Sequence, residues 1–357
     1  MINICFMGNP KFALQTLDIL YRDENINVSL VVSSKDKRRS RNKFSPTPVK
    51  KYAEDHGLRV ETPDSVNTEE FVKMLKELDI DYIVVVAFGQ MIKETLLDNF
   101  KDRIINLHPS FLPKYRGASP MQFTLLNGEK KTAATSMLIE KAMDSGDILI
   151  QREMDIEEND DYFDLEEKLG KLGGEAIRDS IINYEEVYKN RTAQDDSQAT
   201  FCTKIDKAMG KIDWRKSSDE ILNKIRALVA YPVAFFDYKG ENVKIYKASF
   251  CDKKGEAGEI LAANKKDKLV IGTGDYSIRV EKIQFPGKKA MDTEAFLLGN
   301  DIEVGLILEN DWFWNNFFYS KKSYLWRSKV SWHDKLLCRQ SLQSPTNYKN
   351  SLWSFGK

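Results

Sequence analysis

Three residues of this sequence have side chains suited to acyl transfer between nitrogens: Asn106, His108 and Asp144. Attack of an amine on an acyl carbon creates a tetrahedral oxyanion, which a fixed amide N–H can stabilise. The amine must also lose a proton, and a neutral imidazole can accept it. A carboxylate can orient that imidazole or hold a water that relays the proton. These residue types together therefore predict an acyl-transfer site.

The spacing of these residues supports the prediction. Asn106 and His108 are two positions apart at the end of an apolar run, so both side chains point to one side of an extended chain. The turn Ser145-Gly146 would let the backbone at Asp144 approach closely. Each residue alone is more often structural, as a hydrogen-bonding histidine, a turn-forming asparagine or a loop aspartate. Their joint occurrence at a predicted strand end favours catalysis.

The elements that must position them follow a βαβα rhythm in the first half of the chain. Strands are expected at residues 2–7, 28–32, 82–87, 104–106, 132–139 and 148–154, and helices at residues 11–20, 52–56, 68–78 and 162–189. This rhythm predicts an α/β protein with an N-terminal doubly wound, Rossmann-like, mostly parallel sheet. Ligands of such sheets bind beyond the carboxyl ends of the strands, where residues 88–90 and 106–110 lie.

The second half changes character after a polar segment near residues 191–198. Strand-sized segments then recur between glycine turns, which predicts a small OB-like β-barrel with a helix at residues 218–228. The expected domains are a catalytic domain at 1–190, a linker at 191–204, a barrel at 205–310 and an atypical tail at 311–357. The tail holds five of the six tryptophans and eight Lys or Arg against two Asp or Glu. It is either an extra aromatic, basic element or, the favoured reading, an aberrant extension.

Composition favours a reducing compartment. The four cysteines, Cys5, Cys202, Cys251 and Cys338, are scattered without metal-like spacing, which predicts free thiols and no zinc site. The chain opens directly into a strand, without a leader, and no apolar run approaches the roughly 20 residues of a membrane-spanning helix. We therefore expect a cytoplasmic protein without membrane contact. The sequence does not fix the oligomeric state, and a monomer is the default expectation.

Several spaced motifs resemble the signature of the formyltransferases that use 10-formyltetrahydrofolate. They are Asn-Leu-His-Pro-Ser at residues 106–110, Leu-Pro-Lys-Tyr-Arg-Gly at 112–117 and Met-Asp-Ser-Gly-Asp at 143–147. In that family the asparagine, histidine and aspartate are catalytic, which implies these roles for Asn106, His108 and Asp144. The resemblance also implies 10-formyltetrahydrofolate as a consumed co-substrate and no metal. It places folate against two loops, Ser110, Phe111, Leu112 and Pro113, and Phe88, Gly89, Gln90, Met91 and Ile92.

The second half is similar to the branch of this family that acts on initiator tRNA. Residues 212–214, 225–228, 231–235 and 296–300 resemble parts of that branch's C-terminal barrel, which the short glycinamide ribonucleotide enzymes lack. The resemblance implies formyl transfer to the α-amino group of methionyl initiator tRNA, for translation initiation. It covers residues 1 to about 310, with Asn9 standing where threonine is expected.

A basic loop at residues 35–43 carries six Lys or Arg in nine residues. Such a run is usually solvated surface, although it is also suited to gripping phosphates. The initiator tRNA branch has a similar inserted loop, but Ser40 stands where arginine is expected. The tRNA contacts that we expect are Lys37, Arg38, Arg39, Arg41 and Lys43 in this loop, and Lys204, Lys207 and Lys211 at the barrel entry.

Two other functions remain open at this point. A sugar-nucleotide N-formyltransferase would use the same folate donor and a similar trio, but would have less use for the basic loop. A catalytically silent RNA-binding protein would bind tRNA without transferring a formyl group.

Overall fold

The computed structural model describes residues 1–38 and 44–308. The predictions for Arg39, Arg41, Lys43 and the tail at 311–357 therefore fall outside the described residues, as do the side chains of Lys37 and Arg38. Residues 1–308 belong to one compact unit.

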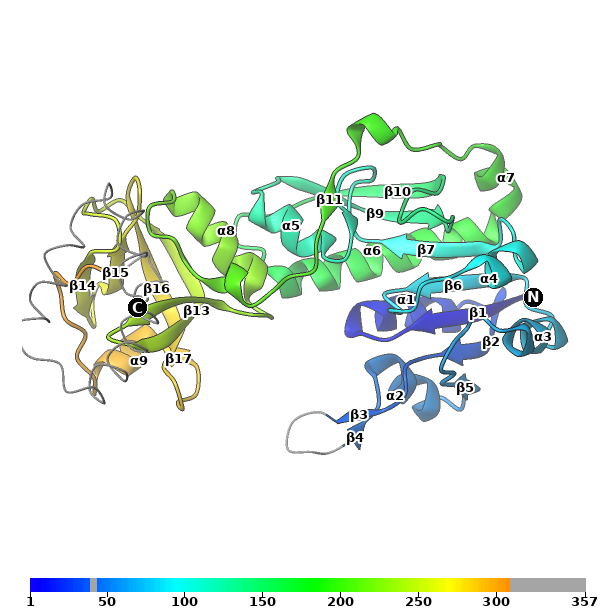
Figure 1. Cartoon of the computed structure of the whole chain (residues 1–357), viewed down its shortest axis with the longest axis horizontal. Coiled ribbons are helices and arrows are strands. Elements are labelled where there is room, and N and C mark those ends of the chain that lie inside the picture. Colours follow the sequence, from blue (N-terminus) through cyan, green and yellow to red (C-terminus); the bar gives the residue numbers. More distant parts are fainter. Residues whose placement is uncertain (39–43, 309–357) are drawn as a thin grey trace, which may run out of the picture. The chain divides into compact units, whose positions relative to one another are not determined.

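A seven-stranded sheet with the order β10-β9-β7-β6-β1-β2-β5 forms the framework of the first part (Figure 1). All neighbouring pairs are parallel except those that β9 makes with β7 and β10, so the prediction of a mostly parallel sheet is confirmed. The strands are β1 (Ile2–Gly8), β2 (Ile26–Val32), β5 (Val60–Glu61), β6 (Tyr82–Val86), β7 (Ile104–His108), β9 (Lys131–Leu138) and β10 (Ile148–Asp155).

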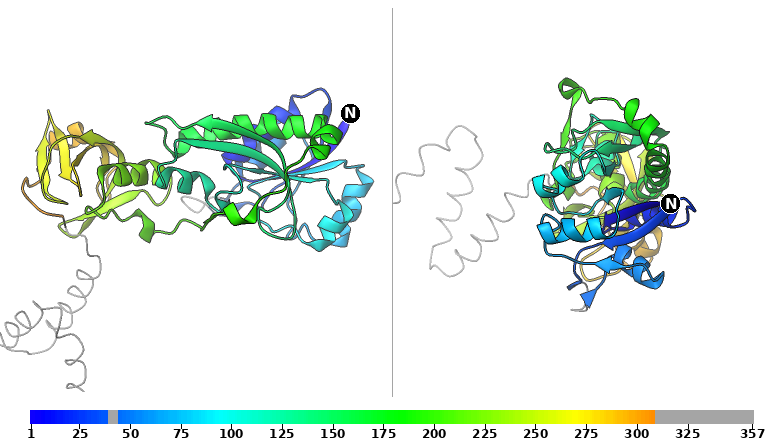
Figure 2. Two further views of the ribbon diagram at one scale, coloured as in Figure 1. Left: turned by 90° about the horizontal axis from the view of Figure 1, so that it is seen from above. Right: turned by 90° about the vertical axis from the view of Figure 1, so that its right-hand side faces the viewer.

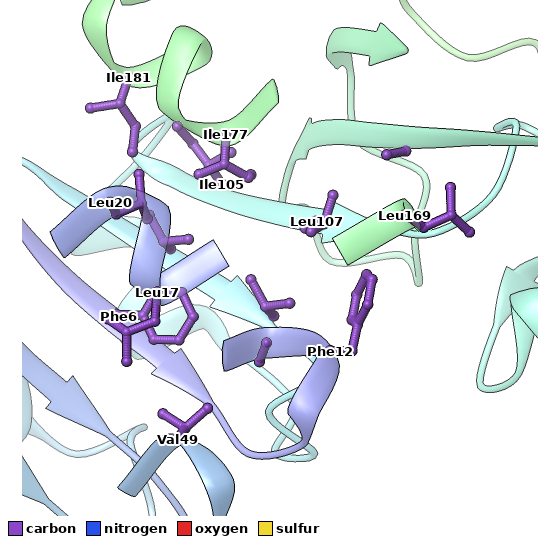
Figure 3. Packing of buried hydrophobic residues seen from close by; sticks show 14 of the residues in the cluster. Phe6, Phe12, Leu17, Leu20, Val49, Ile105, Leu107, Leu169, Ile177 and Ile181 are labelled. Carbon is purple, nitrogen blue, oxygen red and sulfur yellow. The ribbon is translucent and has the colours of Figure 1, made fainter. Parts of the chain in front are cut away.

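Helices cover both faces of this sheet. On one face lie α1 (Lys11–Tyr21) and α6 (Tyr162–Ile182), whose apolar residues share a core with Ile105 and Leu107 (Figure 3). On the other face α3 (Glu69–Glu77) and α4 (Glu94–Asn99) share a core with Ile104. Because side chains alternate along a strand, Asn106 and His108 lie on the face of α3 and α4, and Leu107 lies on the face of α1 and α6.

Helix α6 lies across β7, β9 and β10, and glycines let it approach closely (Figure 1, Figure 2). A Cβ on Gly173 would lie 2.5 Å from Cδ1 of Leu107. The prediction of one helix over residues 162–189 is wrong, because the chain leaves helical geometry at Asn183 (φ −107°, ψ 30°). The Asn183 side chain donates to the carbonyl of Asp179 at 3.3 Å and closes the helix, and α7 (Tyr184–Lys189) then begins.

The second part is an antiparallel sheet with the order β12-β13-β16-β15-β14, and β17 pairs beside β16. Its core surrounds the fully buried Trp214, and α8 (Ser218–Leu228) begins with a capping box at Ser217 and Glu220. The helix predicted at residues 218–228 is found here as α8, and the predicted succession of strands follows it. The strands are β12 (Ala234–Tyr238), β13 (Glu241–Cys251), β14 (Ile260–Asn264), β15 (Lys268–Gly272), β16 (Ser277–Gln284) and β17 (Met291–Asp292), followed by α9 (Thr293–Leu297).

The segment between the two sheets makes main-chain pairs with the first part. Thr192 bridges Ile148, and β11 (Phe201–Cys202) pairs in parallel with β8 (Arg116–Gly117). The sequence pattern also left several short elements unpredicted. Among them are α4, α5 (Pro120–Leu126), α9, the strands β5, β8, β11 and β17, and the hairpin of β3 (Lys37–Arg38) and β4 (Phe44–Ser45). Helix α2 (Pro48–Asp55) is longer at its start than the helix predicted at residues 52–56.

Cys5, Cys202 and Cys251 are buried free thiols. Among the described helices, none is both long enough and apolar enough to cross a membrane.

Replacing Gly173 with alanine should lower the free energy of unfolding by about 1–3 kcal/mol, because the new methyl group overpacks the buried Leu107. Gly170→Ala in the same helix is the matched control. Its Cβ would meet mainly the end of the half-buried Gln15 side chain, which can turn away, so helix propensity should leave stability unchanged or slightly higher. Denaturant unfolding measures both, and equal effects would contradict this packing argument.

Candidate active site

A cavity of about 710 Å³ opens beyond the carboxyl ends of β1, β6 and β7. Asn106, His108 and Asp144 all line it, so the structure brings the predicted trio to one place. One of the two predicted folate loops lines it too, with Phe88, Gly89, Gln90, Met91 and Ile92. Ligands of open α/β sheets bind at this edge.

His108 is buried, with 5% of its surface exposed, and has a different neighbour at each ring nitrogen. Nε2 lies 2.9 Å from the carbonyl oxygen of Tyr115, and Nδ1 lies 3.7 Å from Oδ2 of Asp144. Because a carbonyl only accepts hydrogen bonds, Nε2 carries the hydrogen in the neutral ring. Nδ1 is then the basic nitrogen, and a proton gained there would face the Asp144 carboxylate.

Asp144 is held in place through its own backbone and that of Gly117. Asp144 has a left-handed φ of 52°. Its Oδ2 accepts a hydrogen bond from the Gly117 N–H at 2.8 Å. Gly117 (φ 119°) cannot carry a side chain, because a Cβ would lie 2.3 Å from the carbonyl oxygen of Cys202. Gly146 is equally confined, with a Cβ position 2.0 Å from the Leu138 carbonyl oxygen. The Asp144 turn therefore depends on glycine at two positions.

A polar clamp that the sequence pattern did not predict supports the same turn. Nε2 of Gln194 donates to the carbonyls of Asp144 (3.0 Å) and Gly146 (2.7 Å). Its Oε1 accepts two hydrogen bonds from the buried Arg116 guanidinium, at 2.9 and 3.0 Å. Arg116 also pairs with Asp196 at 2.8 Å. Arg116 belongs to a noted motif, but Gln194 is 78 residues away in the chain, so nothing in the local pattern revealed the clamp.

Tyr115 presents the carbonyl that His108 contacts. Its φ is 61°, and its N–H donates to Oγ1 of Thr200 at 2.9 Å. The Cys202 thiol lies 3.4 Å from the same carbonyl, and burial raises the pKa of Cys202, which favours the protonated, donating form. Thr200 and Cys202, which belong to the segment predicted as a linker, thus hold the Tyr115 carbonyl that His108 contacts.

Asn106 lies in the interior of the sheet, paired with Val85 and Met137. It is half-buried and lines the cavity. Within the described residues its carboxamide makes no hydrogen bond, so both its donor and its acceptor are available to a ligand.

The loop at residues 88–92 is tied to its neighbours by Asn9, the residue that departs from the family pattern. Asn9 Nδ2 donates to the carbonyl of Phe88, and its Oδ1 accepts from the Ser34 N–H at 2.8 Å and the Ser33 hydroxyl at 3.0 Å. Gly89 has a φ of 85°, which glycine adopts without strain. Asn9 therefore links the ends of β1, β2 and β6.

Residues Ser110–Pro113 do not line the cavity, although Pro109 does. Ser110 and Leu112 are buried, and Phe111 is 38% exposed. The Ser110 hydroxyl donates to the Lys114 carbonyl at 2.7 Å, and its own carbonyl accepts from Thr135 Oγ1 at 2.7 Å. These bonds fix the loop that connects His108 to Tyr115.

None of the predicted tRNA-contacting lysines and arginines within the described residues lines the cavity. The backbone of Lys37 and Arg38 pairs with Ser45 and Phe44 in the β3–β4 hairpin. Lys204 and Lys207 are exposed, whereas Lys211 is half-buried and its carbonyl accepts from Lys224 Nζ at 2.8 Å. Burial lowers the pKa of Lys224. No group of three metal-binding side chains was found in the part of the chain that the structure describes.

Comparison with known proteins places this geometry in a family. The formyl transferase pattern matches residues 2–181, and the formyl transferase C-terminal domain pattern matches residues 204–301. An N-formyltransferase from Helicobacter canadensis, solved with folinic acid and dTDP-3-aminofucose, is similar in fold. Its TM-score is 0.58 at 21% identity, over 78% of this chain and 99% of that one.

Two relatives are more similar in sequence. The methionyl-tRNA formyltransferase of Finegoldia magna is 38% identical over 307 residues, covering 85% of this chain and 99% of that protein. That of Caldanaerobacter subterraneus is 38% identical over 310 residues, covering 86% and 100%. With both domains matched and in the same order, the chain belongs to the methionyl-tRNA formyltransferase family.

Proposed function

We propose that this protein transfers the formyl group of 10-formyltetrahydrofolate to the α-amino group of methionyl initiator tRNA, for translation initiation. The observation that carries the proposal is the pairing of the buried His108 with the half-buried Asp144, in the cavity that Asn106 also lines, in a chain 38% identical to methionyl-tRNA formyltransferases. A sugar-nucleotide acceptor has no comparable support, since the similarity to sugar N-formyltransferases is one of fold.

In the proposed reaction, Asn106, His108 and Asp144 assist the exchange of one carbon–nitrogen bond for another. The amine nitrogen attacks the formyl carbon, and the bond between that carbon and N10 of the folate then breaks. The Asn106 amide donates to the developing oxyanion. His108 accepts the amine proton at Nδ1 and returns it to the departing nitrogen, while Asp144 stabilises the intervening imidazolium. The 3.7 Å separation leaves this ion pair to tighten only after proton transfer.

We further propose two roles for the predicted folate loops. Phe88, Gly89, Gln90, Met91 and Ile92 line the cavity and would receive the pterin. Ser110, Phe111, Leu112 and Pro113 would meet the folate only at the exposed Phe111 ring, and their hydrogen bonds would otherwise hold His108 and Tyr115 in register.

We propose that basic residues hold the tRNA. Lys37 and Arg38 form strand β3, Arg39, Arg41 and Lys43 follow them in the sequence, and Lys204 and Lys207 are exposed near the entry to the second sheet. We infer that this sheet is an OB-like barrel, because register shifts along the β13–β16 pair are of the kind that bend strands toward closure. We also propose that the protein works as a monomer in the cytoplasm, where its tRNA is charged.

Asn106→Ala and His108→Ala should each lower kcat by about 10²–10³-fold or more, because each removes a group that acts in the transition state. Affinity for methionyl-tRNA should stay nearly unchanged. His56→Ala, an exposed histidine stacked on Tyr52 and absent from the cavity lining, is the control. A formylation assay with charged initiator tRNA decides the matter, and a wild-type protein that forms no formylmethionyl-tRNA with ample folate would refute the proposed function.

Gln194→Ala should lower kcat by about tenfold, because the Asp144 turn loses two hydrogen bonds. The KM for methionyl-tRNA and the KM for folate should change little. Gln194→Glu should be worse, since it sets a carboxylate against two carbonyl oxygens. Gln198→Ala, an exposed glutamine of the same segment, is the matched control. Wild-type kcat in Gln194→Glu would exclude a positioning role.

Replacing Lys37, Arg38, Arg39 and Arg41 together with alanine should raise KM for the tRNA and leave KM for folate unchanged. The dependence of log affinity on log salt concentration should become shallower, by roughly 0.7–0.9 for each phosphate that the variant no longer neutralises. Lys51→Ala with Lys73→Ala removes exposed charges elsewhere and serves as the control. Full activity with unchanged tRNA affinity would count against a tRNA acceptor.

A further inference from the structure

The cavity has two sides, separated by the end of β7. On the side of α3 and α4 lie the pterin loop and residues 139–143. On the side of α1 and α6 the cavity is lined by Phe12, Leu107, Met121, Tyr162 and Glu166. Because the proposed folate loop occupies the first side, the second side is available to the acceptor.

Apolar side chains form most of this second side. Phe12, Leu107 and Met121 are 2–7% exposed and belong to the core between α1 and α6. Figure 3 shows Leu107, Leu169 and Phe12 among the buried side chains of this core. The contact of Gly173 with Leu107 sets how closely α6 approaches, and Glu166 lies two turns before Gly173. An uncharged thioether side chain would suit such walls.

Glu166 is the exception among these residues. It is only 9% exposed, and it lines the cavity. Its Oε1 accepts a hydrogen bond from the Tyr162 hydroxyl at 3.1 Å. Within the described part of the chain, Glu166 has no ion pair and no second hydrogen bond. A buried carboxylate without a cation is costly. A positively charged ligand beside Glu166 would reduce this cost.

We propose that Glu166, supported by Tyr162, binds the α-ammonium group of the aminoacyl acceptor before that group releases its extra proton to water; the proton that His108 accepts is the one released later, when the amine attacks. This inference rests on the proposed function, which supplies an amine as the acceptor. An α-amino group has a reference pKa of about 7.7–8.0 and so carries a charge near neutral pH. Formylation turns the amine into a neutral amide, which ends the ion pair. Glu166 therefore favours substrate over product and assists product release.

The test compares three ligands on the full-length protein at about pH 6.5, where the amine is charged. They are methionyl-tRNA, formylmethionyl-tRNA and uncharged initiator tRNA. The wild-type protein should bind methionyl-tRNA roughly 10- to 100-fold more tightly than formylmethionyl-tRNA, the range for a hydrogen bond between charged groups. Glu166→Gln should lose most of this preference, and Tyr162→Phe should lose part of it. KM for folate and the Tm should not change in either variant.

Glu167→Gln is the matched control, because it removes the same charge from the next, exposed position of α6. It should keep the wild-type preference. An unchanged preference in Glu166→Gln would overturn the proposal. So would an equal loss of affinity for all three tRNAs, which would indicate a contact to a ribose hydroxyl. A fall in Tm with a rise in both KM values would show a packing role and would also overturn it.

Failure of the proposed function gives a different result. In that case the wild-type protein itself forms no formylmethionyl-tRNA, whatever residue stands at position 166. An active wild type whose Glu166→Gln variant keeps the preference overturns only the present inference.

Discussion

The hydrogen bond between Nε2 of His108 and the carbonyl of Tyr115 determines what the other groups of the site can do. Because the carbonyl can only accept, it fixes the ring tautomer and leaves Nδ1 as the nitrogen without a hydrogen, facing Asp144. The Asp144 carboxylate is useful only if Nδ1 stays on its side. A carbonyl can be aimed this way only by backbone geometry, which explains the left-handed φ of 61° at Tyr115. Side-chain chemistry here depends on a main-chain conformation.

Tyr115 and Asp144 would not keep their left-handed conformations unaided. A left-handed φ in a residue other than glycine costs about 1–3 kcal/mol and persists only when the surroundings impose it. They do so through a distant stretch of chain: Thr200 receives the Tyr115 N–H, and Gln194 holds the Asp144 carbonyl. The polar composition of residues 191–204 predicted only a connection between domains. In the structure this segment supplies the hydrogen bonds that support the site.

The sequence predicted well whatever depends on local pattern. Alternation and apolar runs predicted the central strands, and the spacing of Asn106 and His108 predicted a shared side. Pairings between distant segments leave no such pattern, so the Gln194 clamp and the β8–β11 pair were missed. The helix break at Asn183 was missed because the charged, periodic pattern continues through it. The role of Asn9 was underestimated, since its three partners come from two other strand ends.

Under the proposed function, the alternation along β7 would let one short strand serve two substrates. Asn106 and His108 lie on the face of α3 and α4, and residues 88–92 line the same cavity, whereas Leu107 lies on the face of α1 and α6. The strand end is the one place where ligands on both faces can meet, because the sheet separates them everywhere else. A donor and an acceptor that approach from opposite faces must therefore react at this edge. The period of two residues in a β-strand would thus separate the two proposed binding sides and fix the place where they join.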